Sequence, residues 1–174
     1  EIMEGQVREA LAAGACGISL GLAYIPGSSE EEIYRLSQIV ADADKLIAVD
    51  TRLKTPDDLD SLREVVEISR RTGARTQVSH FVYQYGTGVL TEALAIIDEA
   101  RAEGIDIRLD SGMYTPWTSG IQAVLFSPES LAASSLELSD ILIITGPYKG
   151  QRMTKERYDE LRTQEERTSV VVFG

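Results

Sequence analysis

Four short runs of β-forming residues recur at a regular interval along the first two thirds of the chain. They read CGISLGL, LIAVDTR, TQVSHFV and DIRLDSG, and they begin at Cys16, Leu46, Thr76 and Asp106. Each run begins with alternating or continuous β-forming residues and ends in small or polar ones, as buried strands do. The interval of about 30 residues is the size of one strand–helix unit. The pattern therefore predicts parallel strands that are joined by helices.

The segments between these runs have the period of amphipathic helices. In each of two segments, four apolar residues share one face: Leu59, Leu62, Val65 and Val66, and then Leu90, Ala93, Leu94 and Ile97. Ser29 followed by Glu32 is a capping-box pattern, and Thr55 before Pro56 predicts the N-cap of the following helix. Gly73 stands where that helix is expected to end.

Two architectures agree with this order of elements: an open doubly wound sheet and part of a (β/α)8 barrel. An open sheet often carries a glycine-rich nucleotide loop after its first strand, but the loops LAYIPGSS, TRLKTPD and VYQYGTG match neither G-x-G-x-x-G nor a P-loop. The even spacing and the polar strand ends favour a partial (β/α)8 TIM barrel in the α/β class.

The regular pattern ends after Tyr114, and three segments are predicted from there. Residues 1–114 form consecutive strand–helix units, and residues 115–150 form an irregular, serine-rich insertion or rim segment that ends in the strand-like run ILIITGP. Residues 151–174 then form a short polar helix and a final barrel strand, SVVVF.

The charge, the apolar content and the cysteine count of the chain exclude several classes of function. The formal net charge is −11, from 28 acidic and 17 basic residues, which argues against binding to nucleic acid or to an anionic membrane surface. No apolar run approaches the length of a transmembrane helix. The single cysteine, Cys16, excludes an internal disulfide framework and fits a reducing compartment, so we expect a cytoplasmic protein in which this thiol is buried.

Three polar residues occupy equivalent positions at the ends of successive predicted strands: Asp50, His80 and Asp110. In a (β/α)8 barrel such side chains point into the active-site mouth. Two carboxylates and an imidazole there suit zinc or a similar divalent metal. Alternatively, Asp110 caps the following loop, Asp50 pairs structurally with Arg52, or His80, the one histidine of the chain, is a core residue.

The chain also resembles a known family over most of residues 5–120. The stretches GACGISLGLAYIPGSS, GARTQVSHF and ALAIIDEARAEGIDIRLDSGMYTPWTSG are similar to segments of the N-acyl-D-amino-acid deacylases (D-aminoacylases). SVVVFG resembles the strand that precedes the catalytic aspartate of these enzymes. They are metal-dependent hydrolases on (β/α)8 barrels, in the amidohydrolase superfamily that also contains the dihydroorotases.

The resemblance implies roles for individual residues. His80 matches the histidine that binds metal from the sixth barrel strand, and Asp50 stands where the T-H-x-R motif of the family has a histidine ligand. Arg52 matches the arginine of that motif, and Tyr24 and Tyr114 match aromatic residues of the substrate pocket. With Asp110, these three residues form the expected substrate-binding set.

By the same resemblance the chain covers about strands 4–8 of the barrel, the C-terminal half. The H-x-H metal motif would then precede Glu1, and the general-base aspartate would follow Gly174, so the chain itself contains no catalytic base. We therefore expect a zinc-type metal in the whole protein, hydrolysis of a non-peptide C–N bond in an N-acyl-D-amino acid or a cyclic amide, and no activity in the isolated chain.

Three further expectations remain open. Asp50 in place of histidine would also fit a non-catalytic, degenerate relative that has lost its metal site. A barrel that binds a phosphorylated ligand is a third possibility. Because a partial barrel leaves strand edges unpaired, we expect the chain to self-associate through them.

Overall fold

The computed structural model describes residues 1–52, 58–86, 88–134 and 136–173. The chain divides into two compact units, Glu1–Gly112 and Met113–Gly174. Each unit has its own sheet and its own hydrophobic core, and the two are described separately.

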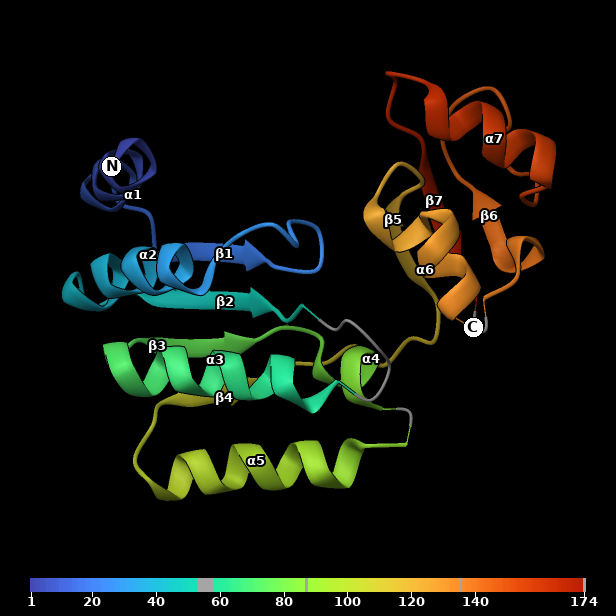
Figure 1. Ribbon diagram of the computed structural model, residues 1–174. Helices are drawn as coiled ribbons and strands as arrows, with labels where there is room; N and C mark the ends of the chain where they lie inside the picture. Colours follow the sequence, from blue (N-terminus) through green and yellow to red (C-terminus); the bar gives the residue numbers. More distant parts are fainter. Residues whose placement is uncertain (53–57, 87, 135, 174) are drawn as a thin grey trace. The chain divides into compact units, whose positions relative to one another are not determined.

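The first unit contains a four-stranded parallel sheet in the order β1-β2-β3-β4. Its strands are β1 (Gly17–Gly21), β2 (Leu46–Asp50), β3 (Arg75–Val78) and β4 (Ile107–Leu109). Its helices are α1 (Ile2–Ala12), α2 (Glu30–Asp42), α3 (Leu59–Thr72), α4 (Phe81–Tyr85) and α5 (Leu90–Ala102). Strands and helices alternate along the chain, so the predicted parallel α/β fold is confirmed (Figure 1).

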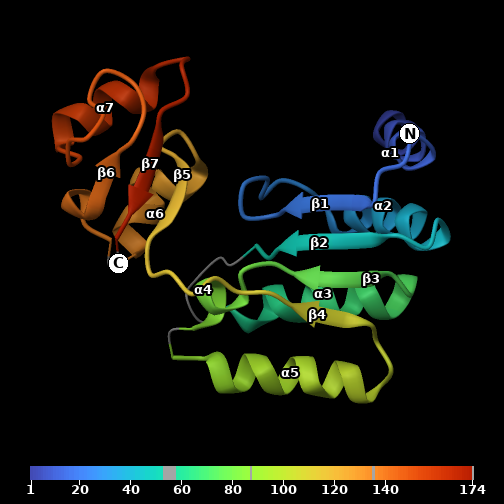
Figure 2. The same ribbon diagram turned by 180° about the vertical axis from the view of Figure 1, so that it is seen from behind.

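The core of this unit lies between the sheet and its helices. α2 and α3 lie in front of the strands in Figure 1 and behind them in Figure 2. Ile47 and Val49 of β2 are buried against these helices. Because side chains alternate along a strand, Ala48 and Asp50 point to the opposite face of the sheet. The face that carries Asp50 is thus separated from the helix-covered core.

The apolar helix faces agree with the sequence pattern at all positions but one. Leu62, Val65 and Val66 of α3 are buried, as are Ala93 and Ile97 of α5. Leu94 is 38% exposed. The buried face of α5 runs through Ala93, Ile97 and Ala100. Leu94 directly follows Ala93, and successive residues of an α-helix are turned by about 100° around its axis. Leu94 therefore lies at the border of the buried face.

Capping side chains and a glycine mark the ends of the helices. The Ser29 side chain accepts a hydrogen bond from the backbone N–H of Glu32 at the start of α2. Asp58 is the N-cap of α3, whereas the predicted cap, Thr55, lies outside the described residues. Gly73 ends α3 with a φ of 70°, a left-handed conformation that glycine adopts without a steric cost.

Two expectations about surfaces can be compared with the structure. Cys16 is exposed, not buried, because it lies just before β1 and outside the layer between sheet and helices. In residues 1–52, 58–86, 88–134 and 136–173, no helix has the length and apolar character needed to cross a membrane.

The second unit is built on an antiparallel sheet. Its strands are β5 (Trp117–Gly120), β6 (Ile141–Ile143) and β7 (Ser169–Val172), in the order β5-β7-β6. Its helices are α6 (Pro128–Ala133) and α7 (Lys155–Thr163), with short 3₁₀ turns η1 (Val124–Phe126) and η2 (Leu138–Asp140).

This arrangement differs from the expected insertion and final barrel strand. Within residues 115–150, β6 matches the expected strand-like run ILIITGP, whereas β5 and α6 lie in the part that was expected to be irregular. The last run, SVVVF, forms β7 and pairs antiparallel with both neighbours. Val170 and Val172 of β7 pack with Phe126, Tyr158 and Leu161 in a separate core. A strand pattern by itself does not specify its partner, since parallel and antiparallel strands can share the same alternation.

Candidate functional site

Asp50 and His80 form a direct pair at the carboxyl edge of the parallel sheet. His80 Nε2 lies 3.2 Å from Asp50 Oδ1, and the side chains are 46% and 24% exposed. The two residues come from successive strand–loop connections, which parallel pairing of β2 with β3 brings to the same edge. The register inferred from sequence spacing thus brings these two predicted ligands together.

A tight turn directs the imidazole toward Asp50. β3 ends at Val78, and His80 follows in a left-handed conformation with a φ of 37°. Asp110 Oδ1 accepts the backbone N–H of His80 at 2.6 Å, and its Oδ2 accepts the Gln77 side-chain amide at 3.0 Å. Asp110 therefore holds the turn after β3 that carries His80, and not the loop that follows Asp110 itself, as the capping alternative supposed.

A chain of hydrogen bonds supports the other side of the imidazole. Gln84 Oε1 accepts from the Thr51 hydroxyl at 2.5 Å and from the Thr51 N–H at 3.3 Å. The Gln84 amide nitrogen consequently faces Ser79 O at 3.1 Å and His80 Nδ1 at 3.1 Å. The Tyr85 hydroxyl lies 2.7 Å from Thr51 Oγ1 and completes the chain. Burial raises the pKa of Tyr85 to about 12, so this hydroxyl stays protonated at neutral pH.

The hydrogen-bond partners assign the neutral tautomer of His80. Because Gln84 donates to Nδ1, that nitrogen accepts, and Nε2 carries the proton that points to Asp50. The hydrogen bond to Asp50 raises the pKa of His80 above its ordinary value, against the opposing effect of partial burial.

The loop between β1 and α2 brings Tyr24 to the same edge. A Cβ atom placed on Gly21 would lie 3.2 Å from Tyr24 Cδ2 and 4.0 Å from Asp50 Oδ2. The tyrosine ring therefore lies over Gly21, near the Asp50 carboxylate. Its side chain is 41% exposed, which suits a residue at the rim of a binding site.

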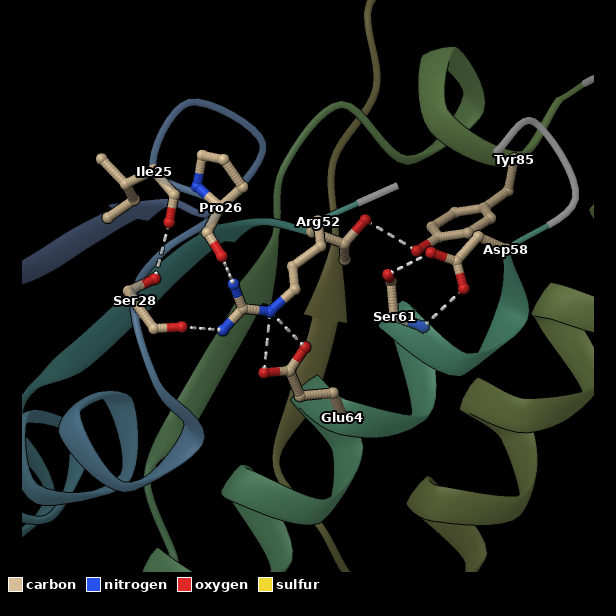
Figure 3. Close-up of polar contacts among 9 residues, drawn as sticks. Ile25, Pro26, Ser28, Arg52, Asp58, Ser61, Glu64 and Tyr85 are labelled. Atoms are coloured by element: carbon tan, nitrogen blue, oxygen red, sulfur yellow. Dashed lines mark hydrogen bonds and ion pairs between the residues drawn. The ribbon is translucent and has the colours of Figure 1, made fainter. Parts of the chain in front are cut away.

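Arg52, the fifth predicted site residue of this unit, lies in a largely buried cluster. Its Nε donates to both carboxylate oxygens of Glu64 in α3, at 3.1 and 2.9 Å. Its terminal nitrogens donate to Pro26 O at 3.2 Å and Ser28 O at 2.7 Å (Figure 3). The Arg52 side chain is 10% exposed, so protein atoms cover most of the guanidinium.

Tyr114 belongs to the second unit, where it is 78% exposed. It is therefore not grouped here with Asp50 and His80. A hollow of about 390 Å³ in the first unit is lined by Leu46, Arg75 and Asp106, which stand at the amino ends of their strands. That hollow is at the opposite edge of the sheet from His80.

Sequence reasoning missed Gln84, Thr51 and Glu64. Gln84 lies four residues after His80, a spacing at which helical side chains are neighbours. That signal was hidden because the segment VYQYGTG reads as a loop. Glu64 lies on the polar face of α3, and nothing in its local sequence indicates that Arg52 reaches it.

The described residues do not complete a zinc site. A catalytic zinc needs about three protein ligands, and His80 with Asp50 supplies two. Within the part of the chain that the structure describes, no group of three His, Cys, Asp or Glu side chains could hold a metal ion. A metal at His80 Nε2 would also have to replace the proton shared with Asp50. These residues therefore fit a metal only together with ligands from elsewhere in the protein.

Comparison with known proteins identifies a relative in sequence and several in structure. No family model matches the sequence. An N-acyl-D-glutamate deacylase from Alcaligenes xylosoxydans xylosoxydans is 38% identical over 112 residues, which are 62% of this chain and 23% of that protein.

Solved structures extend the likeness to almost the full chain. The N-acyl-D-glutamate deacylase of Bordetella bronchiseptica, complexed with zinc and a phosphonate inhibitor that mimics the tetrahedral intermediate, matches with a TM-score of 0.78 and 25% identity. The match covers 98% of this chain and 37% of that one. A D-aminoacylase described as defining a novel subset of amidohydrolases matches with a TM-score of 0.76 at 22% identity, which shows the fold alone.

The chain thus spans less than two fifths of the length of these relatives. The resemblance predicted from the sequence motifs is confirmed: this chain is similar in sequence to an N-acyl-D-glutamate deacylase and, over 98% of its length, has the fold of part of the D-aminoacylases, which are amidohydrolases.

Proposed function

We propose that the protein containing this chain is a metal-dependent amidohydrolase that removes the acyl group of an N-acyl-D-amino acid. The observation that carries the proposal is the pairing of His80 with Asp50 at the carboxyl edge of a parallel sheet that matches a zinc-containing deacylase. In (β/α)8 barrels this edge forms the active site. In this proposal the parallel strands β1 to β4 supply four consecutive strands of such a barrel, within the expected range of about strands 4–8.

The residues of the chain have supporting roles in this reaction. A bound metal would supply an activated water and polarise the amide carbonyl. Asp50 and His80 would contribute two of its ligands, Asp110 would keep the His80 turn in place, and Tyr24 would line the substrate pocket. The pocket role of Tyr114 stays a prediction. Since the described residues lack a third ligand, no hydrolytic step is assigned to this chain alone.

A deacylase assay tests the proposal. The whole protein loaded with zinc is expected to release amino acid from N-acetyl-D-glutamate or another N-acetyl-D-amino acid, and to leave the L-enantiomers intact. The 174-residue chain, assayed in parallel at the same zinc concentration, is expected to be inactive. Lack of hydrolysis by the whole protein across a panel of N-acyl-D-amino acids and cyclic amides would sink the proposal.

A second candidate function has an observation in its favour. Asp50 bonds directly to His80 Nε2, the atom that a metal would use, and it occupies a position at which the resemblance implies histidine. A degenerate, non-catalytic relative would keep this hydrogen-bonded pair without a metal. Metal content separates the two candidates, as developed in the Discussion.

We also infer that the isolated chain self-associates through its strand edges. Among the described strands of the parallel sheet, β1 and β4 each pair on one side, and unpaired edges are templates for further strands. Light scattering of the 174-residue chain is expected to give a mass above the monomer that rises with concentration. A monomer mass throughout the concentration range would contradict this. The cytoplasmic location stays a prediction.

A further inference from the structure

We propose that Arg52 is a positioning residue, which clamps the loop between β1 and α2 and thereby keeps Tyr24 beside Asp50. This role differs from the direct substrate contact that the sequence resemblance implies for the arginine. The part that concerns Tyr24 and substrate rests on the proposed function; the part that concerns the loop does not.

The clamp spans two elements that are distant in sequence. On one side the guanidinium donates to the carbonyl oxygens of Pro26 and Ser28 in the loop. On the other side its Nε is held by Glu64 of α3. Figure 3 shows the guanidinium between these groups. Hydrogen bonds from a charged donor in a largely buried place are stronger than neutral ones, so the loop is anchored to the helix through one side chain.

The loop is shaped by hydrogen bonds between its own residues. Its backbone hydrogen bonds run from Tyr24 N to Gly21 O, from Ile25 N to Leu22 O, and from Ser28 N to Ile25 O. The Ser28 hydroxyl donates to Ile25 O as well. At the start of the loop, Leu22 N donates to Asp50 O of β2, and the Arg52 bonds add an attachment further along the loop.

The geometry leaves Arg52 poorly placed for a substrate. The side chain is 10% exposed and that of its partner Glu64 is 14% exposed. Tyr24, by contrast, is 41% exposed, and both its ring and the Asp50 carboxylate lie close to Gly21. Arg52 therefore acts on the site through the position of Tyr24.

Hydrogen–deuterium exchange of the whole protein tests the clamp. In Arg52→Gln, amides of residues 22–29 are expected to exchange at least about tenfold faster, because two charge-assisted bonds to the loop are lost. The amides of β2 should keep their exchange rates, which excludes general unfolding. Arg52→Lys should speed loop exchange as well, because an ammonium lacks the planar fork that reaches two carbonyls and Glu64 together.

Arg70→Gln is the matched control. Arg70 also lies on the first unit and pairs with Glu67 and Glu103, but on the surface and away from the loop. Its replacement is expected to leave exchange of residues 22–29 unchanged. Unchanged loop exchange in Arg52→Gln would overturn the clamp.

A kinetic cycle tests the link to Tyr24. Arg52→Gln is expected to lower kcat/KM about tenfold in the native background and less than about twofold in a Tyr24→Ala background, because residues that act through one another are not additive. If the two substitutions lower kcat/KM additively and Arg52→Gln leaves amide exchange of the loop unchanged, Arg52 is a direct substrate contact instead. If the whole protein has no deacylase activity, the proposed function fails while the exchange result still decides the clamp.

Discussion

Replacing Phe81 by alanine is expected to lower the free energy of unfolding by about 3–5 kcal/mol. Phe81 is 2% exposed and belongs to the core of the first unit. Its ring centroid lies 5.1 Å from that of Tyr85 on the same short helix. The substitution removes a buried aromatic ring and leaves a cavity in the core that the surrounding side chains fill only in part.

The consequence reaches the candidate site. Phe81 directly follows His80, and its N–H donates to Asp110 O at 2.8 Å. Loss of the ring loosens α4, and with it Gln84 and the turn that carries His80. Urea denaturation followed by circular dichroism measures the effect. Val82→Ala is the control, since Val82 is 47% exposed and its truncation is expected to cost less than about 1 kcal/mol. Equal urea concentrations at the unfolding midpoint for Phe81→Ala and Val82→Ala would refute the role of Phe81 in the core.

Replacing His80 by asparagine in the whole protein is expected to remove bound metal and to lower kcat/KM at least about 100-fold. Asparagine tolerates the left-handed backbone found at position 80, so the variant removes the imidazole with little backbone strain. Metal content is measured by elemental analysis after dialysis, and activity on an N-acyl-D-amino acid after reloading with zinc.

The control for this experiment is Gln77→Ala. Gln77 donates to the Asp110 carboxylate but does not contact the imidazole, so its loss is expected to leave the metal content unchanged. If the native protein takes up no metal under any loading condition, the degenerate relative is supported and the proposed function fails. If His80→Asn retains full metal content and activity, His80 is not a ligand.

Much of the first unit could be predicted because its signals are local. Each strand was found from its β-forming residues, and α3 and α5 were found from their apolar period, and both signals need only a short window of sequence. Helix α5 shows the limit of this reasoning: Leu94 fits the period but lies at the border of the buried face. The exposure of Cys16 was missed for a similar reason, since its apolar neighbours say nothing about where the sheet ends.

The candidate site could be predicted to the level of its two central residues. A regular strand interval places Asp50 and His80 at one edge of any parallel sheet, whatever the rest of the fold. The roles of their neighbours could not be predicted. Asp110 was expected at the mouth, and the structure shows its carboxylate engaged by the His80 backbone and Gln77.

The sequence by itself thus determined the order of strands and helices in the first unit, the buried faces of α3 and α5, and the position of Asp50 and His80 at one edge of the sheet, because these follow from periodicity and from chain direction. Tertiary structure alone decided three features: that Gln84 supports the imidazole, that Arg52 joins the β1–α2 loop to Glu64, and that β7 pairs antiparallel with β5 and β6. The Arg52 and β7 features depend on hydrogen-bond partners that lie far apart in the chain, and the Gln84 feature depends on a short helix without a recognisable apolar period. A local sequence pattern does not specify such partners, because tertiary packing selects them.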